Sequence, residues 1–98
     1  MEGEKMRESS IESKLRKAVK GMGGIPVKLV ASSLDGMPDR LILLPDSKMA
    51  FIELKAPGKK LRPLQEKRKR QLQALGFLVY CIDETEKIGG ILDEIRTS

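Results

Sequence analysis

A tight polar turn between two apolar runs constrains the fold of this chain more than any other feature. Residues 39–44 and 49–56 are rich in apolar side chains, and the residues between them, 45–48, are a proline followed by three polar residues. Proline followed by polar residues is typical of a turn, and so short a connection favours neighbouring antiparallel strands. The sequence therefore predicts a β-hairpin over residues 39–56.

A helix and a strand are expected ahead of this hairpin. Ser9 followed by Glu12 is a capping-box pattern, and apolar residues then recur at helical spacing as far as a glycine-rich segment. Residues 25–33 alternate as a strand does. Residues 1–8 are polar, and we expect them to be frayed. Residues 9–98 then form a single domain.

A second helix, a fourth strand and a third helix are expected after the hairpin. Pro63 is well placed in the first turn of a helix that runs to about Leu75. Residues 77–83 are a continuous apolar strand, predicted to be buried on both faces, and residues 85–96 close the chain as a helix. A helical crossover joins strands that run parallel. The order α-β-β-β-α-β-α predicts an α/β sandwich around a mixed sheet of four strands.

The composition excludes several kinds of chemistry. The 98 residues include no His and one Cys, which rules out a Ser-His-Asp triad, His-ligated zinc and a disulfide framework. Nothing in the sequence indicates an organic cofactor. The longest apolar run, residues 77–82, is far short of the roughly 18 residues that span a membrane. No signal peptide is visible, so a reducing cytoplasm is the expected location.

Basic residues are concentrated in one segment. The net charge is +5, but residues 55–70 hold eight Lys or Arg side chains against one acid, and the rest of the chain is close to neutral or acidic. Such clustering indicates a polyanionic partner. The alternative is a solvated helix face without a partner.

Two carboxylates and a lysine are expected to meet on the hairpin. Glu53 and Lys55 lie two residues apart on one strand, so their side chains share a face. Pairing through the turn brings Asp39 near the level of Lys55 or just beyond it. With a backbone carbonyl, the two carboxylates form a partial oxygen site for Mg²⁺ or Mn²⁺, beside which the lysine can hold an attacking water. The alternative is an exposed ion cluster.

These residues carry a resemblance to a known group of enzymes. Pro38-Asp39 followed by Glu53-Leu54-Lys55 resembles the P-D…E-x-K arrangement of the PD-(D/E)xK nuclease superfamily. That pattern by itself is moderately specific. It implies a restriction-endonuclease-like fold and hydrolysis of phosphodiester bonds with a divalent metal ion.

Further positions narrow the resemblance. Glu12 in the first helix, Gly36 ahead of the P-D pair and Gln65 at the start of a helix are similar to a stand-alone VRR-NUC domain, the virus-type replication-repair nuclease. The resemblance covers residues 9–83. Many members carry Ser at the position occupied here by Arg62, so the role of that hydroxyl is unfilled.

The resemblance implies roles for the matching residues. Asp39 and Glu53 would ligate the metal, with the Leu54 carbonyl as a third ligand. Glu12 would reach the metal directly or through water, unless it serves as the helix cap instead. Lys55 would position the attacking water and stabilise charge on the phosphate.

Gln65 and the basic residues complete the expected site. Gln65 would hydrogen-bond Lys55 or the scissile phosphate; the alternative is an exposed polar residue. The three aromatic residues lie on predicted strands, which leaves no stacking platform for single strands, so duplex or branched DNA is expected. The best candidates for DNA-backbone contacts are Lys59, Lys60, Arg62, Lys67, Arg68 and Arg70.

The expected function is a metal-dependent, structure-selective DNA endonuclease that acts on branched DNA such as four-way (Holliday) junctions, in repair, in a bacterial cell or a phage-infected host. Symmetric cutting of a junction requires two active sites, which implies a homodimer. Residues 77–82 and the last helix also carry more apolar surface than a small monomer easily covers. The alternatives are a nuclease of flaps or linear duplex, a non-catalytic DNA-binding module, and a small basic RNA-binding protein of α/β type.

Overall fold

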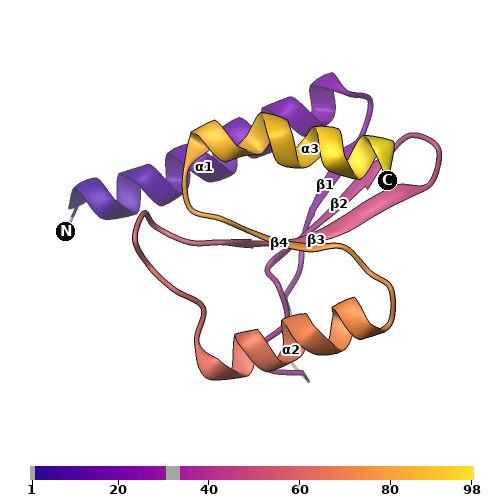
Figure 1. Cartoon of the computed structure of the whole chain (residues 1–98). Helices are drawn as coiled ribbons and strands as arrows, with labels where there is room; N and C mark the ends of the chain where they lie inside the picture. Colours follow the sequence, from indigo (N-terminus) through magenta and orange to yellow (C-terminus); the bar gives the residue numbers. More distant parts are fainter. Residues whose placement is uncertain (1, 31–33) are drawn as a thin grey trace.

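A four-stranded mixed sheet forms the middle layer of the protein. The computed structural model describes residues 2–30 and 34–98, and the strands lie side by side in the order of the chain. Helices α1 and α3 cover one face of the sheet and α2 lies on the other (Figure 1), which confirms the predicted α/β sandwich. The elements are α1 (Glu2–Gly21), β1 (Ile25–Lys28), β2 (Arg40–Leu44), β3 (Lys48–Leu54), α2 (Pro63–Ala74), β4 (Val79–Ile82), the 3₁₀ helix η1 (Thr85–Lys87) and α3 (Ile88–Thr97).

The central hairpin has a three-residue turn, one residue shorter than expected. Leu44 pairs with Lys48, and Asp46 and Ser47 between them take positive φ angles of 64° and 61°. Asp tolerates this left-handed conformation, which lets the chain reverse within fewer residues. The prediction that Asp39 lies level with Lys55 is therefore wrong: in the observed register it lies level with Glu53.

The fourth strand pairs with β3 in parallel, as the crossover through α2 predicted. Phe51 lies opposite Val79, and β4 forms one edge of the sheet. The prediction that this strand is buried on both faces is wrong in part, because Tyr80 and Cys81 are only half-buried. An edge strand lacks a neighbour on one side, so its side chains have less cover.

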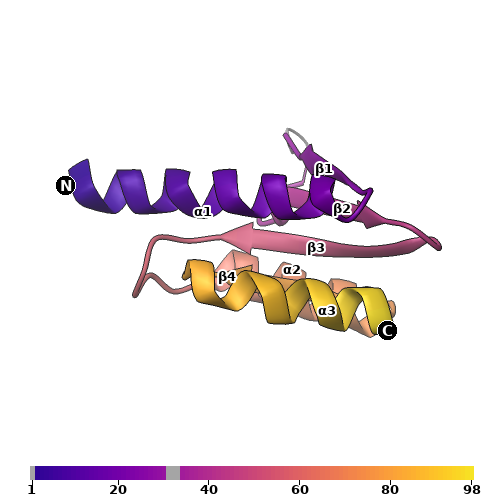
Figure 2. The same ribbon diagram turned by 90° about the horizontal axis from the view of Figure 1, so that it is seen from above.

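The hydrophobic core lies between the sheet and the layer formed by α1 and α3. Seen from above, these two helices run in the same direction along the sheet (Figure 2). Ile88, Leu92 and Ile95 of α3 are buried in this core, and Ile91 is half-buried, so most of the apolar side of α3 that we expected to serve dimerisation is covered within the chain. Leu75 and Phe77, outside α3, remain exposed. The buried core includes Ile11, Leu15, Val19, Ile42, Ile52, Ile82, Ile88, Leu92 and Ile95.

The two N-terminal elements differ from their predicted bounds. Helix α1 begins at Glu2, so Ser9 lies inside the helix, and the predicted capping box is wrong. Residues 2–8, which we expected to be frayed, continue the helix in the structure, and most of them are good helix formers. Strand β1 ends at Lys28, and the predicted continuation over 31–33 lies outside the described residues.

Helix α2 begins at Pro63, as predicted, and ends at Ala74, one residue before the expected end. Gly76 follows with a φ of 98°, the left-handed conformation that commonly ends a helix. Within residues 2–30 and 34–98, no helix combines the length and the apolar character that a membrane crossing requires.

Candidate active site

Asp39 lies immediately before β2, opposite the C-terminal end of β3. Its Oδ1 atom accepts a hydrogen bond from the main-chain N–H of Leu54, 3.1 Å away. Pro38, the preceding residue, is buried and anchors the chain at this point. The carboxylate is therefore fixed by the backbone of the neighbouring strand.

The loop that delivers Asp39 is packed against α2. Gly36 has a φ of +84°, and a Cβ atom there would lie 2.7 Å from the carbonyl oxygen of Leu64. From the same helix, Arg68 donates to the carbonyl oxygen of Asp35 through Nε and Nη2, at 3.0 and 2.9 Å. These contacts make the position of Asp39 depend on α2.

Glu53 is a buried carboxylate on the α2 side of the sheet. It is 8% exposed, and its Oε2 accepts a hydrogen bond of 3.3 Å from Nε2 of Gln65. Burial, and then the charge of Asp39, raise the pKa of Glu53 to about 7, against smaller opposing effects of Lys55 and nearby arginines. A cation bound beside it would favour the ionised form.

Gln65 has two functions at the start of α2. Its Oε1 accepts a hydrogen bond of 2.8 Å from the main-chain N–H of Arg62, just ahead of the helix, and its Nε2 holds Glu53. The side chain is buried, so the alternative of an exposed polar residue is wrong. Its partner in the structure is Glu53, whereas we expected Lys55 or a phosphate. The sequence could not distinguish these partners, because no local pattern shows which side chain of β3 a helix packed on the sheet will contact.

Lys55 follows the last residue of β3. Its main-chain N–H donates to the carbonyl oxygen of Ile82 at 3.0 Å, so the chain still runs beside β4 at this point. Alternation along the strand places the Lys55 side chain on the same face as Glu53. Its positive charge lowers the pKa of Glu53, as expected for a nearby cation. The structure thus brings together four of the predicted site residues: Asp39, Glu53, Lys55 and Gln65.

Glu12 lies on α1, apart from this group, and Arg40 connects the two. Glu12 pairs with Arg16 at 3.0 Å and with Nη2 of Arg40 at 3.8 Å. Nη1 of Arg40 donates to the carbonyl oxygen of Asp39 at 3.0 Å and lies 3.4 Å from Asp39 Oδ2. The long side chain of Arg40 thus reaches the residue that precedes it, which the alternation of side chains along a strand does not indicate.

The oxygen atoms around Asp39 and Glu53 suit a hard divalent cation. Among the residues that the structure describes, no group of three or more Asp, Glu, His or Cys side chains is arranged to hold a metal. Mg²⁺, however, usually takes only one or two carboxylates and keeps several waters. Two carboxylates with the Leu54 carbonyl fit that requirement. Glu12 as a direct or water-mediated ligand stays a prediction.

The basic residues lie in the loop before α2 and on the helix itself. Five of the six predicted DNA contacts are exposed, and Arg70 also pairs with Glu66 at 3.7 Å. Arg68 is bonded to Asp35, so part of its function is to hold the loop. Arg62 is close enough for its charge to lower the pKa of Glu53. The exposed five are Lys59, Lys60, Arg62, Lys67 and Arg70.

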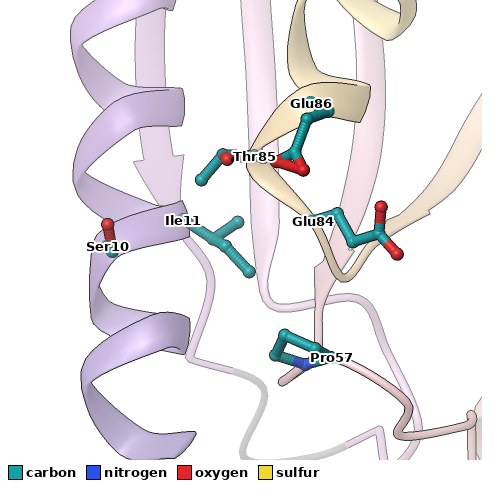
Figure 3. Close-up of a pocket in the computed structure, with 6 residues that line it drawn as sticks. All are labelled: Ser10, Ile11, Pro57, Glu84, Thr85 and Glu86. Carbon is teal, nitrogen blue, oxygen red and sulfur yellow. Dashed lines mark hydrogen bonds between the residues drawn. The ribbon is translucent and has the colours of Figure 1, made fainter. Parts of the chain in front are cut away.

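Two hollows flank the ends of the strands on the α1 side of the sheet. One, of about 490 Å³, is bordered by two carboxylates and no basic residue, which does not suit a phosphate; Figure 3 shows its lining. The other, of about 420 Å³, includes Arg40 and Leu54 and so adjoins the predicted site. The first is lined by Ser10, Ile11, Pro57, Glu84, Thr85 and Glu86, and the second by Glu8, Ser9, Glu12, Lys28, Arg40 and Leu54.

The α/β sandwich and the P-D…E-x-K site on its central hairpin together define the PD-(D/E)xK class of domain. No family model matches the chain. It is 43% identical over 91 residues to "Putative nuclease p44" of Acyrthosiphon pisum secondary endosymbiont phage 1, covering 93% of this chain and 97% of that protein. A solved structure described as a VRR_NUC domain superposes with a TM-score of 0.82 at 22% identity, covering 89% of this chain and 95% of that one. The chain belongs to the same family as the phage protein, and it has the fold of the VRR-NUC domain.

Proposed function

We propose that this protein is a metal-dependent endonuclease that hydrolyses phosphodiester bonds in DNA. One observation carries the proposal: the buried carboxylate of Glu53 lies level with Asp39 across the hairpin, with Lys55 next along the same face. Burying a carboxylate disfavours folding unless it is compensated, and a domain that only binds DNA gains nothing from it. The name of the phage relative, which includes the word nuclease, supports the same proposal.

Each residue of the site has a distinct part in the proposed reaction. Asp39 and Glu53, with the Leu54 carbonyl, would hold Mg²⁺ or Mn²⁺, which supplies a water of lowered pKa and neutralises charge on the phosphate. Lys55 would orient the attacking water and stabilise the negative charge that develops on the phosphate oxygens. Gln65 holds Glu53 Oε2 in place, so we assign it a positioning role.

The basic loop and α2 are the proposed DNA-binding surface, because they lie on the same side of the sheet as Glu53. Lysine and arginine contacts to phosphates position a duplex without reading its sequence. Phe51 and Phe77 pack edge to face, with ring centroids 5.7 Å apart, and so form no open platform for unpaired bases. This favours duplex or branched DNA over single strands.

We further propose branched DNA, such as a four-way junction, as the preferred substrate and a homodimer as the active form. A single chain carries one site, and paired symmetric cuts require two sites related by a two-fold axis. Leu75, 74% exposed at the end of α2, and the adjacent Phe77 are apolar surface outside the core on which a second copy could pack.

Cleavage of labelled DNA tests the proposal. The substrates are linear, flap, splayed and four-way DNAs, each with Mg²⁺, Mn²⁺ or EDTA. We expect cutting with either cation and none with EDTA, and Glu53→Gln should lower the rate by more than about a hundredfold, beyond the loss typical of a residue that only supports a metal ligand. Binding of the same DNAs in gel shifts should persist, because the basic surface is unchanged.

Glu84→Gln is the matched control, since it removes one carboxylate from the hollow of Figure 3 and leaves the site intact. Its rate should equal that of the wild type. Undiminished cutting by Glu53→Gln would refute the site assignment. DNA binding by the wild type without any cleavage would instead indicate a non-catalytic module. Light scattering, with and without DNA, measures the oligomeric state.

A further inference from the structure

Arg40 is held between two carboxylates that belong to different elements of the fold. We propose that Arg40 is a positioning residue: it keeps Asp39 and, through Glu12, helix α1 in the arrangement that binding of the divalent cation requires. This inference rests on the proposed function, and it assigns a task to a residue outside the P-D…E-x-K pattern.

The contacts of the guanidinium group carry the argument. Nη1 donates to the carbonyl oxygen of Asp39 at 3.0 Å and lies 3.4 Å from its Oδ2, while Nη2 lies 3.8 Å from Oε2 of Glu12. Because Oδ1 of Asp39 accepts the Leu54 N–H, each oxygen of that carboxylate has a neighbour that fixes it. A planar guanidinium can contact two acceptors at once, which a lysine ammonium does less well.

The surroundings of Arg40 distinguish it from a surface ion pair. Its side chain is 14% exposed, whereas that of Arg16, the other partner of Glu12, is 48% exposed. Contacts of a shielded cation are less screened by water than those of an exposed one. Arg40 and Leu54 both line the hollow of about 420 Å³ beside the site. Lys28, which also lines it, lies opposite Arg40 on the neighbouring strand β1.

The direction in which cation affinity changes when Arg40 is removed distinguishes a positioning residue from a bystander, an arginine that is near the site but has no part in it. A positive charge beside two carboxylates repels an incoming cation, so removing a bystander arginine would strengthen cation binding. If Arg40 instead holds the carboxylates in place, its removal weakens cation binding although a repulsive charge has gone. Loss of affinity in the variant therefore cannot be a simple charge effect.

The experiment compares Arg40→Met with Arg16→Met in the full chain. Methionine keeps much of the apolar stem, and both variants lose one arginine that faces Glu12. Titration calorimetry with Mn²⁺ should show affinity lowered about 10- to 100-fold in Arg40→Met, and unchanged or slightly higher in Arg16→Met. Arg40→Lys should recover little of the loss, because an ammonium cannot span both carboxylates.

Cleavage kinetics then test the link to α1. Adding Glu12→Gln to Arg40→Met should cause little further loss, since the two residues act through one connection. Thermal unfolding checks that each variant is folded; if Arg40→Met does not fold, Arg40→Lys and Arg40→Gln provide the same Mn²⁺ comparison.

Two results would overturn the proposal: Mn²⁺ binding by the folded Arg40 variants as tight as or tighter than that of the wild type, or fully additive losses with Glu12→Gln. The proposed nuclease function fails separately, if the wild type does not cut DNA or Glu53→Gln cuts normally. The Mn²⁺ titration needs no DNA, so it tests Arg40 in either case.

Discussion

The two faces of the sheet use neighbouring residues of one strand for different purposes. On the face covered by α1 and α3, Ile52 is fully buried among aliphatic side chains. On the face toward α2, the next residue, Glu53, is nearly as buried but contacts the amide of Gln65. The two-residue period of a strand thus separates the groups that stabilise the domain from those proposed to act on DNA.

Substitutions at these two neighbours should separate stability from activity: Ile52→Ala should mainly lower stability, and Glu53→Gln should mainly lower cleavage. We expect Ile52→Ala to lower the free energy of unfolding by about 2–5 kcal/mol, because it removes a buried side chain and leaves a cavity. Glu53→Gln should cost far less, since the amide is close in shape and carries no charge to bury. Urea denaturation of the two variants measures both values. An equal loss in the two would show that the faces do not divide these tasks.

The pH dependence of stability should sharpen the same comparison. The folded-state pKa of Glu53 is about 7, above the ordinary value of 4.5, so folding favours the protonated form. Its contribution to stability is therefore complete below about pH 4.5 and declines as the pH rises toward 7. Without metal, the wild type should lose on the order of 3 kcal/mol relative to Glu53→Gln across that interval.

Denaturation at pH 4.5, 6 and 8 in EDTA tests this expectation, with the difference between wild type and Glu53→Gln as the readout. Taking the difference removes the titration of other groups. The loss caused by Ile52→Ala should stay nearly constant over the same range, because no charge changes there. A difference between wild type and Glu53→Gln that does not vary with pH would contradict the raised pKa.

A pair of glycines tests how far the α2 face depends on the packing of its loop. Gly36 and Gly58 have nearly the same positive φ, 84° and 82°, but only at Gly36 would a Cβ meet a close neighbour, the carbonyl oxygen of Leu64. Gly58→Ala should cost about 1 kcal/mol of backbone strain and lower cleavage less than Gly36→Ala does, since Gly58 does not pack against the loop that delivers Asp39. Gly36→Ala should cost more and also lower cleavage, because the loop that delivers Asp39 must move. Equal cleavage by the two variants would mean that this loop tolerates displacement.

Most of the architecture could be predicted from local patterns. The hairpin turn, Pro63 at the start of α2 and the apolar spacing of the last helix each follow from short-range chemistry, and each element is present. The turn is one residue shorter than predicted, and the last helix begins with the 3₁₀ turn η1, so that α3 itself starts at Ile88. The predicted start of α1 is wrong because a Ser followed three residues later by Glu can also occur inside a helix, where it caps nothing. Helix propensity over the preceding residues decided the outcome.

The geometry of the candidate site could be predicted only in part. The P-D…E-x-K spacing made Asp39 and Glu53 candidates, but their relative level depended on a turn of three residues, made possible by two residues in the left-handed conformation. The two-residue period of a strand predicts the face of the sheet from which a side chain leaves the backbone. It does not predict where the end of a long side chain lies. For that reason the contact between Arg40 and Asp39, and the use of Arg68 to hold Asp35, could not be inferred.

The hydrogen bond that fixes Asp39 comes from the main chain of Leu54 and from no side chain. An alanine scan would not detect this hydrogen bond, because every residue except proline has the same main-chain N–H group. The side chain at position 54 can thus vary with the demands of the core while the carboxylate remains held. Relatives of this protein could therefore differ at position 54 and still hold the Asp39 carboxylate in the same place. Backbone structure is then a better guide than sequence identity to which relatives keep this site.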